Sequence, residues 1–414
     1  MKYFKAISAI VLLLALAGKN QAQETKKSLQ ECIEMAMQNN LTMQSGKIAI
    51  AQAKELQGTA FNIDKTQLSL TQDPSSGGSP DNSLSLSQSF DFPTVYASRH
   101  SLLKAKTNLE KNNLEITRNE LIRQISSIYY QLLYARENIK ILQQQDTIYK
   151  KFVFLATSKF HAGETGRLEQ MNAERLYNES KIALQQAEKD YQSSQFALQR
   201  WLNTNELINP SETTLTILDN PLAVNDFNLN QNPINQVFES KKIIGEKSLN
   251  LAKQEFLPSF NFALRSQYLI TSFNPYNIQR ERFTDGNFMG FEVGIGIPLF
   301  FGEQRAKTRA AKREVETLKI MQEDALLSLN REYQIALNEY AKAKNALDYY
   351  QTQGNGQADE ISRIAQISYE KGEIGYIEYI QNLKTAAELH LQFTYAVNNY
   401  NQSIITINYL QGNK

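Results

Sequence analysis

The sequence predicts a mainly helical protein that also carries strands of a membrane β-barrel, built as an internally duplicated chain. Three observations support this fold class. Two heptad-like apolar patterns of about 70 residues each indicate very long helices. Two pairs of segments alternate apolar and polar residues, as amphipathic strands do. The same order of elements occurs twice along the 414 residues, which indicates a repeat.

The ends and the composition of the chain limit its class. A formal charge of +1, from 44 basic and 43 acidic residues, gives no indication of a nucleic-acid partner. In residues 1–22, Lys2 and Lys5 precede an apolar run, the pattern of a secretory signal peptide. After it, no apolar run is long enough for a transmembrane helix. Cys32, the single cysteine, falls on an apolar helical stripe and is therefore expected in the core.

The first repeat is expected to occupy residues 23–220. A capping box formed by Ser28 and Glu31 should open its first helix. Its later elements, in order, are a β-hairpin over 66–92, a long helix over 94–162, a return helix over 167–203 and an irregular segment. Residues 73–80, rich in Pro, Gly and Ser, should be the loop of the hairpin.

The second repeat is expected to occupy residues 221–414. Its elements are a helix over 233–255, a β-hairpin over 258–297, a long helix over 303–371 and a return helix over 374–411. The strand from Phe291 to Ile297 alternates strictly, with its large apolar residues on one face. Gly354 and Gly356 fall inside the second long helix, where two glycines should break or bulge it.

The four strands predict an oligomer. Each is about ten residues long, enough to cross a bilayer when tilted. Four strands cannot close on themselves, and lipid does not tolerate open strand edges. We therefore expect several chains to contribute strands to one barrel. The alternative, a soluble four-stranded sheet packed on helices, would favour longer apolar runs.

The sequence gives no indication of enzyme chemistry. It has no Gly-rich phosphate loop and no Ser, Cys or His arrangement typical of nucleophilic catalysis. His100, His161 and His390 are far apart, and none has a second ligand at metal-binding spacing. We therefore expect no catalytic residues, no cofactor and no metal site.

Several segments resemble the TolC-type outer-membrane efflux proteins. They are Ser28–Asn40, Gly290–Gly302 (GFEVGIGIPLFFG), and the twin turns at Gly163-Glu164 and Gly372-Glu373. The resemblance implies a homotrimer whose twelve-stranded barrel in the outer membrane continues into a long α-helical barrel in the periplasm. It also implies a passive exit duct that docks to a periplasmic adaptor and an inner-membrane pump. Tyr369–Leu383 resembles the branch that serves heavy-metal pumps of the resistance-nodulation-division class.

The glycine turns are the predicted docking tips. They end the long helices, so we expect a periplasmic rim that meets the adaptor. Its residues would be Gly163, Glu164 and Thr165 in the first turn, and Gly372, Glu373, Ile374 and Gly375 in the second. The alternative is that these glycines only provide left-handed helix caps.

Glu378 is the predicted pore constriction. It lies six residues beyond Gly372, where the resembling family carries an acidic residue that rings the pore. Three carboxylates in a narrow mouth should favour cations. Glu169 holds the matching position after Gly163, and there we expect a solvated helix face.

Three functions remain open from the sequence. The first is the outer-membrane duct of a tripartite efflux system, for heavy metals or drugs. The second is the exit duct of a type I protein secretion system. The third is a secreted periplasmic coiled-coil scaffold. Duplicated strands with aromatic ends, such as Phe90, Phe92 and Phe291, favour a duct in outer-membrane lipid.

Overall fold

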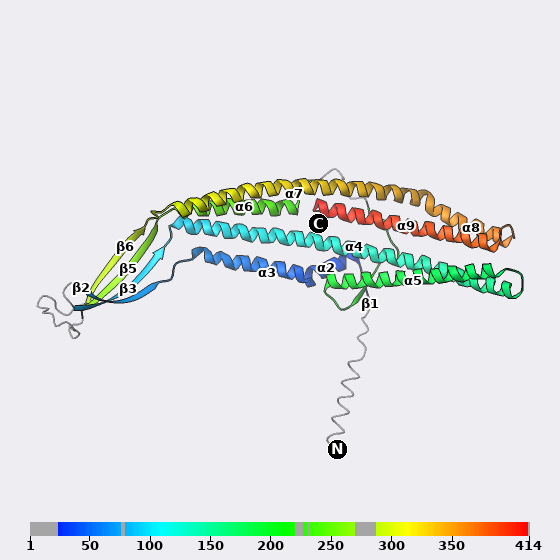
Figure 1. Ribbon diagram of the computed structural model, residues 1–414, viewed down its shortest axis with the longest axis horizontal. Helices are drawn as coiled ribbons and strands as arrows, with labels where there is room; N and C mark the ends of the chain where they lie inside the picture. The colour runs from blue at the N-terminus through cyan, green and yellow to red at the C-terminus, as the bar shows by residue number, and fades with distance from the viewer. Residues whose placement is uncertain (1–23, 76–78, 220–226, 230–231, 270–286, 413–414) are drawn as a thin grey trace, which may run out of the picture. The chain divides into compact units, whose positions relative to one another are not determined.

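A computed structural model describes residues 24–75, 79–219, 227–229, 232–269 and 287–412 (Figure 1). The expected signal peptide and most of the expected loop at 271–287 lie outside these residues. The described residues form two compact units: unit 1 comprises those within 24–45, 115–232 and 327–412, and unit 2 comprises those within 46–114 and 233–326. The units cut across the two repeats, because in each unit elements of the first repeat pack against elements of the second.

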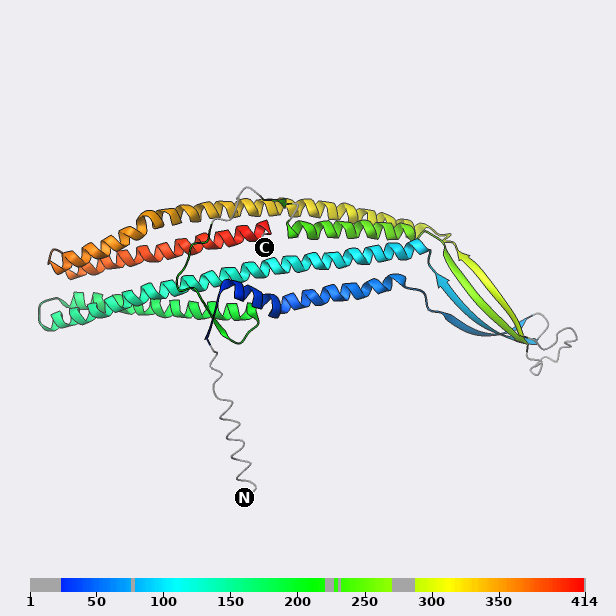
Figure 2. The same ribbon diagram turned by 180° about the vertical axis from the view of Figure 1, so that it is seen from behind.

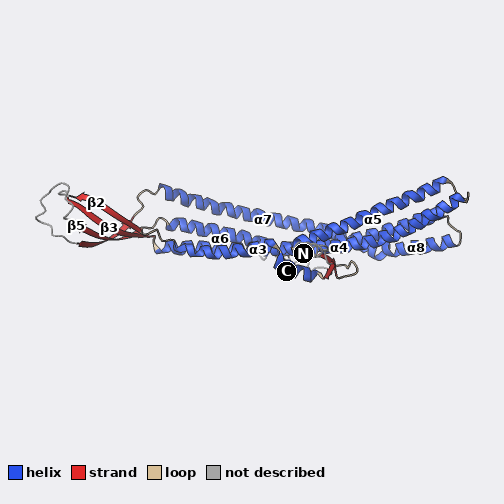
Figure 3. Ribbon diagram, turned by 90° about the horizontal axis from the view of Figure 1, so that it is seen from below, coloured by secondary structure: helices blue, strands red, loops and turns tan. Residues whose placement is uncertain are grey.

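Unit 2 contains the sheet. Its strands are β2 (Gln67–Ser75), β3 (Ser79–Phe90), β5 (Ser259–Leu269) and β6 (Asn287–Gly296), in this spatial order and all antiparallel (Figures 1 and 3). The two hairpins join through β3 and β5, so the sheet is shared by both repeats. Each strand alternates apolar and polar residues, as the sequence predicted.

The first hairpin is longer than expected. Residues 73–75 and 79–80 were predicted to be loop, but they continue the ladder, with Asp73 opposite Asp81 and Pro74 opposite Pro80. Pro80 lies beyond the last residue of β3 that pairs with β5. Among the described strands it therefore has one neighbour, β2, and a proline is tolerated there because no second described ladder needs its missing N–H.

The helices of unit 2 follow the strand order. They are α3 (Leu41–Leu56), the first part of α4 (Pro93–His161), α6 (Pro233–Gln254) and the first part of α7 (Gly302–Tyr349), with a 3₁₀ turn η1 (Gln57–Phe61) after α3. Thr107 of α4 donates to the Ala53 carbonyl of α3 at 3.1 Å. Asn112 donates to Ser240 of α6 at 2.8 Å, and Gln322 of α7 donates to Asn235 of α6 at 3.1 Å. The order α3, α4, α6, α7 thus matches β2, β3, β5, β6.

Unit 1 contains the remaining helices. They are α2 (Leu29–Asn39), the second part of α4, α5 (Arg167–Leu202), the second part of α7, a π-helix η3 (Tyr350–Gly354), α8 (Asn355–Glu370) and α9 (Tyr376–Gln411). Figure 2 shows α4 running beside α5, and α9 running beside α7 and α8. Hydrogen bonds from Ser180 to Asp146, Gln402 to the Ser127 carbonyl and Gln411 to Tyr333 give the order α5, α4, α9, α7. The core holds Leu121, Ile125, Leu132, Leu198, Ile404 and Ile407.

Two local predictions at the start of the chain are confirmed. The Ser28 N–H donates to Glu31 Oε2 at 2.7 Å, and the Glu31 N–H donates to Ser28 Oγ at 3.3 Å, which together form the capping box. Cys32 is fully buried, and burial raises the pKa of its thiol to about 12. It is therefore a core residue rather than a reactive thiol.

The segment that was expected to be irregular has a structured part. Leu207–Pro210 (β4) pairs in parallel with Glu24–Lys27 (β1), a contact that the sequence pattern did not indicate. Lys140 of α4 donates to the Thr213 carbonyl at 2.9 Å. Asn401 of α9 donates to the Thr216 carbonyl at 2.8 Å and accepts from the Leu218 N–H. We call residues 24–27 and 207–218 the belt; it covers one face of α4 and α9.

Candidate functional site: the hairpin tips and the sheet

The two glycine turns have the same backbone structure. Gly163 and Gly372 adopt φ values of +73° and +76°. In each turn the glycine N–H donates to the carbonyl three residues back, and the next N–H donates to the carbonyl five residues back. The donor–acceptor pairs are Gly163–Phe160, Glu164–Lys159, Gly372–Tyr369 and Glu373–Ser368. This is the Schellman motif, which satisfies the last carbonyls of the helix and requires a left-handed residue.

The rest of each turn also matches. Gly166 and Gly375 are the N-cap residues of α5 and α9, with extended backbones. Thr165 and Ile374, between the glycines, are half-buried, whereas Glu164 and Glu373 are exposed. The predicted docking residues therefore lie together at two matching tips. The capping role of the glycines is established by this geometry, and the docking role stays a prediction.

Glu169 and Glu378 occupy the third position of α5 and α9. A carboxylate in the first turn of a helix is stabilised by the helix dipole. This local effect accounts for an acidic residue at both positions, whatever its function. Glu378 is exposed and Glu169 is half-buried. Within the described residues, neither carboxylate forms a hydrogen bond or an ion pair.

Aromatic residues hold the two tips against each other. Tyr376 at the start of α9 packs on Phe152 of α4 with ring centroids 4.7 Å apart, and on Tyr369 at 5.2 Å. Tyr379 stacks on Tyr369 at 4.8 Å. Ile380 completes a buried cluster with Tyr149, Phe152, Ala156 and Ala173. Burial raises the pKa of Tyr376, and the neighbouring tyrosines and Glu169 raise it further. The phenol therefore stays neutral at physiological pH.

The aromatic cluster was not predicted from the sequence. Tyr369, Tyr376 and Tyr379 recur at spacings of seven and three, a signal for one shared helical face. This spacing could have predicted that the three tyrosines pack together. It could not identify their partner Phe152, which lies more than two hundred positions earlier.

The irregularity predicted at Gly354 is confirmed as a π-helix, η3. Gly354 is buried, and a Cβ there would lie 2.7 Å from Tyr350 Cδ1, so the ring occupies the space left by the missing side chain. Just beyond it, His390 of α9 contacts Asn355 Oδ1 through Nδ1 at 2.8 Å, and its Nε2 lies 3.4 Å from Asp359 Oδ1. His390 thus links α9 to the start of α8.

The sheet exposes an apolar face. One row across the four strands consists of Leu68, Leu86, Leu264 and Phe291. All four side chains are exposed, Phe291 by 81%, and Val293 and Ile295 extend the surface along β6. The other face carries Ser69, Ser85, Ser87, Asn261 and Arg265. Among the described strands, β2 and β6 each have one neighbour only. An exposed apolar face of this kind needs a lipid or protein partner.

The comparisons with known proteins agree with this geometry. The family model described as outer membrane efflux protein matches residues 32–204 and 245–413. The chain belongs to this family. No curated protein sequence is significantly similar to it. Because family members are transport proteins of the outer membrane that extend into the periplasm, the same location holds for this chain, and it is not an enzyme.

Solved structures share the fold. The Campylobacter jejuni CmeC outer membrane channel is 16% identical, with a TM-score of 0.77 over 95% of this chain and 90% of that one. The Vibrio cholerae outer membrane protein VceC is 14% identical, with a TM-score of 0.74 over 93% and 96%. The open Neisseria gonorrhoeae MtrE channel is 15% identical, with a TM-score of 0.73 over 93% and 88%. At these identities the likeness concerns the fold.

No helix in the described part of the chain has the length and apolarity needed to cross a bilayer. Nor do the described His, Cys, Asp and Glu residues gather anywhere in a group of three or more that could hold a metal ion.

Proposed function

We propose that the protein is the outer-membrane exit duct of a tripartite efflux system. The observation that carries this proposal is the sheet of unit 2, which has one exposed apolar face and, among the described strands, two free edges, β2 and β6. Lipid can cover the face, but only another strand can satisfy the free N–H and C=O groups of the edges. The helices repeat this arrangement, with α3 and α7 at the two ends of their layer.

We propose a homotrimer with a twelve-stranded barrel. In this assembly β6 of one copy pairs with β2 of the next, and α7 lies beside the neighbouring α3. Three copies would give the family's twelve strands and continue them into a periplasmic helical barrel. The mass of the purified protein in mild detergent tests the assembly. A stable folded monomer would contradict it.

We propose that the two tips meet a periplasmic adaptor. The tips expose Glu164 and Glu373, and each places one half-buried residue, Thr165 or Ile374, between two glycines. Thr165→Cys and Ile374→Cys should cross-link to an adaptor that carries cysteines at its own tip. Cys32 is buried and should not react, so the wild-type chain serves as the background. No cross-link from either position would contradict docking.

We propose Glu378 as the pore constriction. Its carboxylate has no partner in the described structure, and three copies near one axis would repel one another and attract cations. Glu378→Gln should lower cation selectivity and relieve block by multivalent cations in single-channel recordings. Glu169→Gln, at the matching position of the other hairpin, is the control and should change neither. Unchanged selectivity and block in Glu378→Gln would remove it from the gate.

We propose an inner-membrane pump of the resistance-nodulation-division class as the energy source, with heavy metals or drugs as cargo. The support is the resemblance of Tyr369–Leu383 to the branch serving such pumps. Deleting the gene should sensitise cells to the exported compounds. If the deletion sensitises cells to metal salts but not to drugs, the duct belongs to the branch that serves heavy-metal pumps. A defect limited to polypeptide export would instead support type I secretion.

A further inference from the structure

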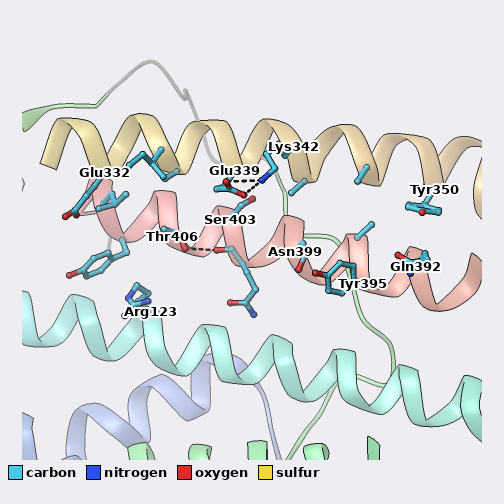
Figure 4. Close-up of a pocket in the computed structure, with 18 residues that line it drawn as sticks. Arg123, Glu332, Glu339, Lys342, Tyr350, Gln392, Tyr395, Asn399, Ser403 and Thr406 are labelled. Atoms are coloured by element: carbon cyan, nitrogen blue, oxygen red, sulfur yellow. Dashed lines mark hydrogen bonds and ion pairs between the residues drawn. The ribbon is translucent and has the colours of Figure 1, made fainter. Parts of the chain in front are cut away.

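Unit 1 has an open groove of about 900 Å³ between α7 and α9, with Arg123 of α4 at one side (Figure 4). Small residues, including Ala336, Ala343 and Ala396, form its lining next to the helix backbones. Three tyrosines, Tyr350, Tyr395 and Tyr409, also line it, and Tyr395 is 50% exposed. A volume of this size falls in the range of pockets for small organic molecules.

The groove lies on the face of unit 1 opposite the belt. The belt contacts α9 through Asn401, and at about 100° per residue Asn399 and Thr406, which line the groove, lie about 160° and 140° away from it around the helix. On α4 the belt contacts Arg136, and Arg123 lies about 140° from that residue. Since a belt of chain that wraps a ring of helices has room only on the outside, the groove faces the inside of the proposed duct.

Most charged groups at the groove already have partners. Arg123 donates from Nε and Nη2 to both carboxylate oxygens of Glu120, at 2.9 and 2.5 Å, and its guanidinium carbon lies 5.1 Å from the centre of the Tyr409 ring. Lys342 donates to Glu339 at 2.9 Å, a pair drawn in Figure 4. In the described structure, Glu332 has neither a hydrogen bond nor an ion pair. The pairs cancel, so the groove keeps one uncompensated negative charge.

The tyrosines do not change this balance. Burial and the Glu120 carboxylate raise the pKa of Tyr409, Arg123 partly opposes them, and Glu332 adds to the increase, so the phenol is neutral at physiological pH. Neutral tyrosine rings present a negative π face to cations. Arg123 already lies over the Tyr409 ring, and Tyr395 is exposed to a ligand. The Glu332 carboxylate, the Tyr395 ring and the alanine-rich lining therefore favour one ligand chemistry, which is a positive charge on an aromatic or otherwise apolar body.

We propose that this groove binds lipophilic organic monocations. The binding site itself depends only on unit 1, whereas its place on the route of transport rests on the proposed function. The proposed site goes beyond a passive duct, because one class of cargo would bind weakly to the wall during its passage. The Arg123–Glu120 and Lys342–Glu339 pairs are each neutral overall, so they distinguish little between anionic and cationic ligands. Glu332 attracts cations and repels anions, so it determines the charge selectivity of the groove.

The experiment measures binding of rhodamine 6G to the full chain in nanodiscs by fluorescence polarisation, with tetraphenylphosphonium as competitor. We expect Glu332→Gln to weaken binding about 5- to 30-fold and Tyr395→Ala to weaken it about 5-fold, because each removes one attraction for the cation. Glu323→Gln is the matched control: Glu323 is exposed on the same helix, outside the groove, and the affinity should not change. Fluorescein, an anionic dye, should not compete.

Unchanged affinity in Glu332→Gln, or equal loss in Glu323→Gln, would overturn the proposal. A second measurement separates it from the proposed function. Tetraphenylphosphonium should reduce single-channel conductance, and Glu332→Gln should relieve the block. If the protein conducts ions but Glu332→Gln does not change dye binding, the binding groove is rejected and the duct is not. Glu332-dependent binding by a protein that forms no channel would reject the duct and leave the groove standing.

Discussion

The two hairpins of unit 1 are built on one plan but make different contacts. Gly163 and Gly372 are 209 positions apart, and the same offset relates the helix starts, Pro93 and Gly302. The turns, the N-cap glycines and the first-turn glutamates all match under this offset. The contacts do not: Met171 on α5 is 56% exposed, whereas its counterpart Ile380 on α9 is 2% exposed.

The hairpins also differ in charge and in regularity. Residues 150–179 carry five basic and four acidic residues, a formal charge of +1, while the matching residues 359–388 carry three and six, a charge of −3. The first long helix is unbroken over 69 residues, and the second includes the π-helix in the same number of residues. A repeated turn motif therefore fixes where the chain reverses, and the side chains around it decide what each tip can bind.

The largest expected difference between the hairpins lies in the buried cluster. Ile380→Ala should lower the free energy of unfolding by about 2–5 kcal/mol, because it removes buried methyl groups and leaves a cavity beside Phe152. Met171→Ala, at the matching exposed position, should change it by less than about 0.5 kcal/mol. Urea titration in detergent measures both. Equal effects would mean that the two hairpins are packed alike in the assembled protein.

The shared turn should give equal effects in both hairpins. Gly163→Ala and Gly372→Ala should each cost about 1–2 kcal/mol, since a Cβ is strained at positive φ. Apart from the adjacent residues, no described atom lies within 4 Å of a Cβ added at either position, so backbone strain is the main cost. Gly166→Ala and Gly375→Ala are the controls, because their φ values of −79° and −75° suit alanine. If one of the two substitutions destabilised the protein clearly more than the other, the two turns would not be structurally equivalent.

In the π-helix, substitutions at Gly354 and Tyr350 should be energetically coupled, whereas the matching positions of the first hairpin should not be. Gly354→Ala gains helix propensity but places a Cβ 2.7 Å from Tyr350 Cδ1, so we expect a net loss of about 1 kcal/mol. Adding Tyr350→Ala should relieve this clash, and a double-mutant cycle measures the relief. Gln145→Ala, the counterpart in α4, should show no coupling to Ile141→Ala. Independent effects at Gly354 and Tyr350 would contradict the packing.

Sequence reasoning predicted the local features of this chain well. The capping box at Ser28, the alternation of the strands and the irregularity at Gly354 each depend on a few neighbouring residues, so a local pattern identifies them. The family itself was also recognised from residue patterns such as Gly290–Gly302. The exposed apolar row of the sheet follows from alternation once the strands are paired.

Contacts between distant segments could not be predicted in the same way. The parallel pairing of β1 with β4 joins residues about 180 positions apart, and neither short strand has a distinctive pattern. The Phe152–Tyr376 contact and the groove at Glu332 each require knowledge of which helix faces meet. The Pro- and Ser-rich residues 73–80 misled the prediction because turn propensity is overridden where a strand can continue its ladder.

The smallest expected difference concerns a pair of surface ion pairs at matching positions. Arg175 and Glu179 on α5 are 2.6 Å apart, and Lys384 and Glu388 on α9, at the same offset, are 3.7 Å apart. Both pairs are half exposed, and both place the basic residue before the acid, which is the weaker orientation on a helix. Exposed pairs of this kind contribute at most about 0.5 kcal/mol.

We therefore expect Arg175→Gln to destabilise the protein by a few tenths of a kcal/mol, and Lys384→Gln by less, because its pair is longer. Raising the ionic strength from about 0.01 M to 1 M shortens the screening length roughly tenfold, so the Arg175 effect should disappear at high salt. Thermal unfolding of both variants at the two salt concentrations measures this. A larger, salt-independent loss in Lys384→Gln would show instead that the Lys384 side chain stabilises by packing, since it lines the small cavity beside Ile148 and His390.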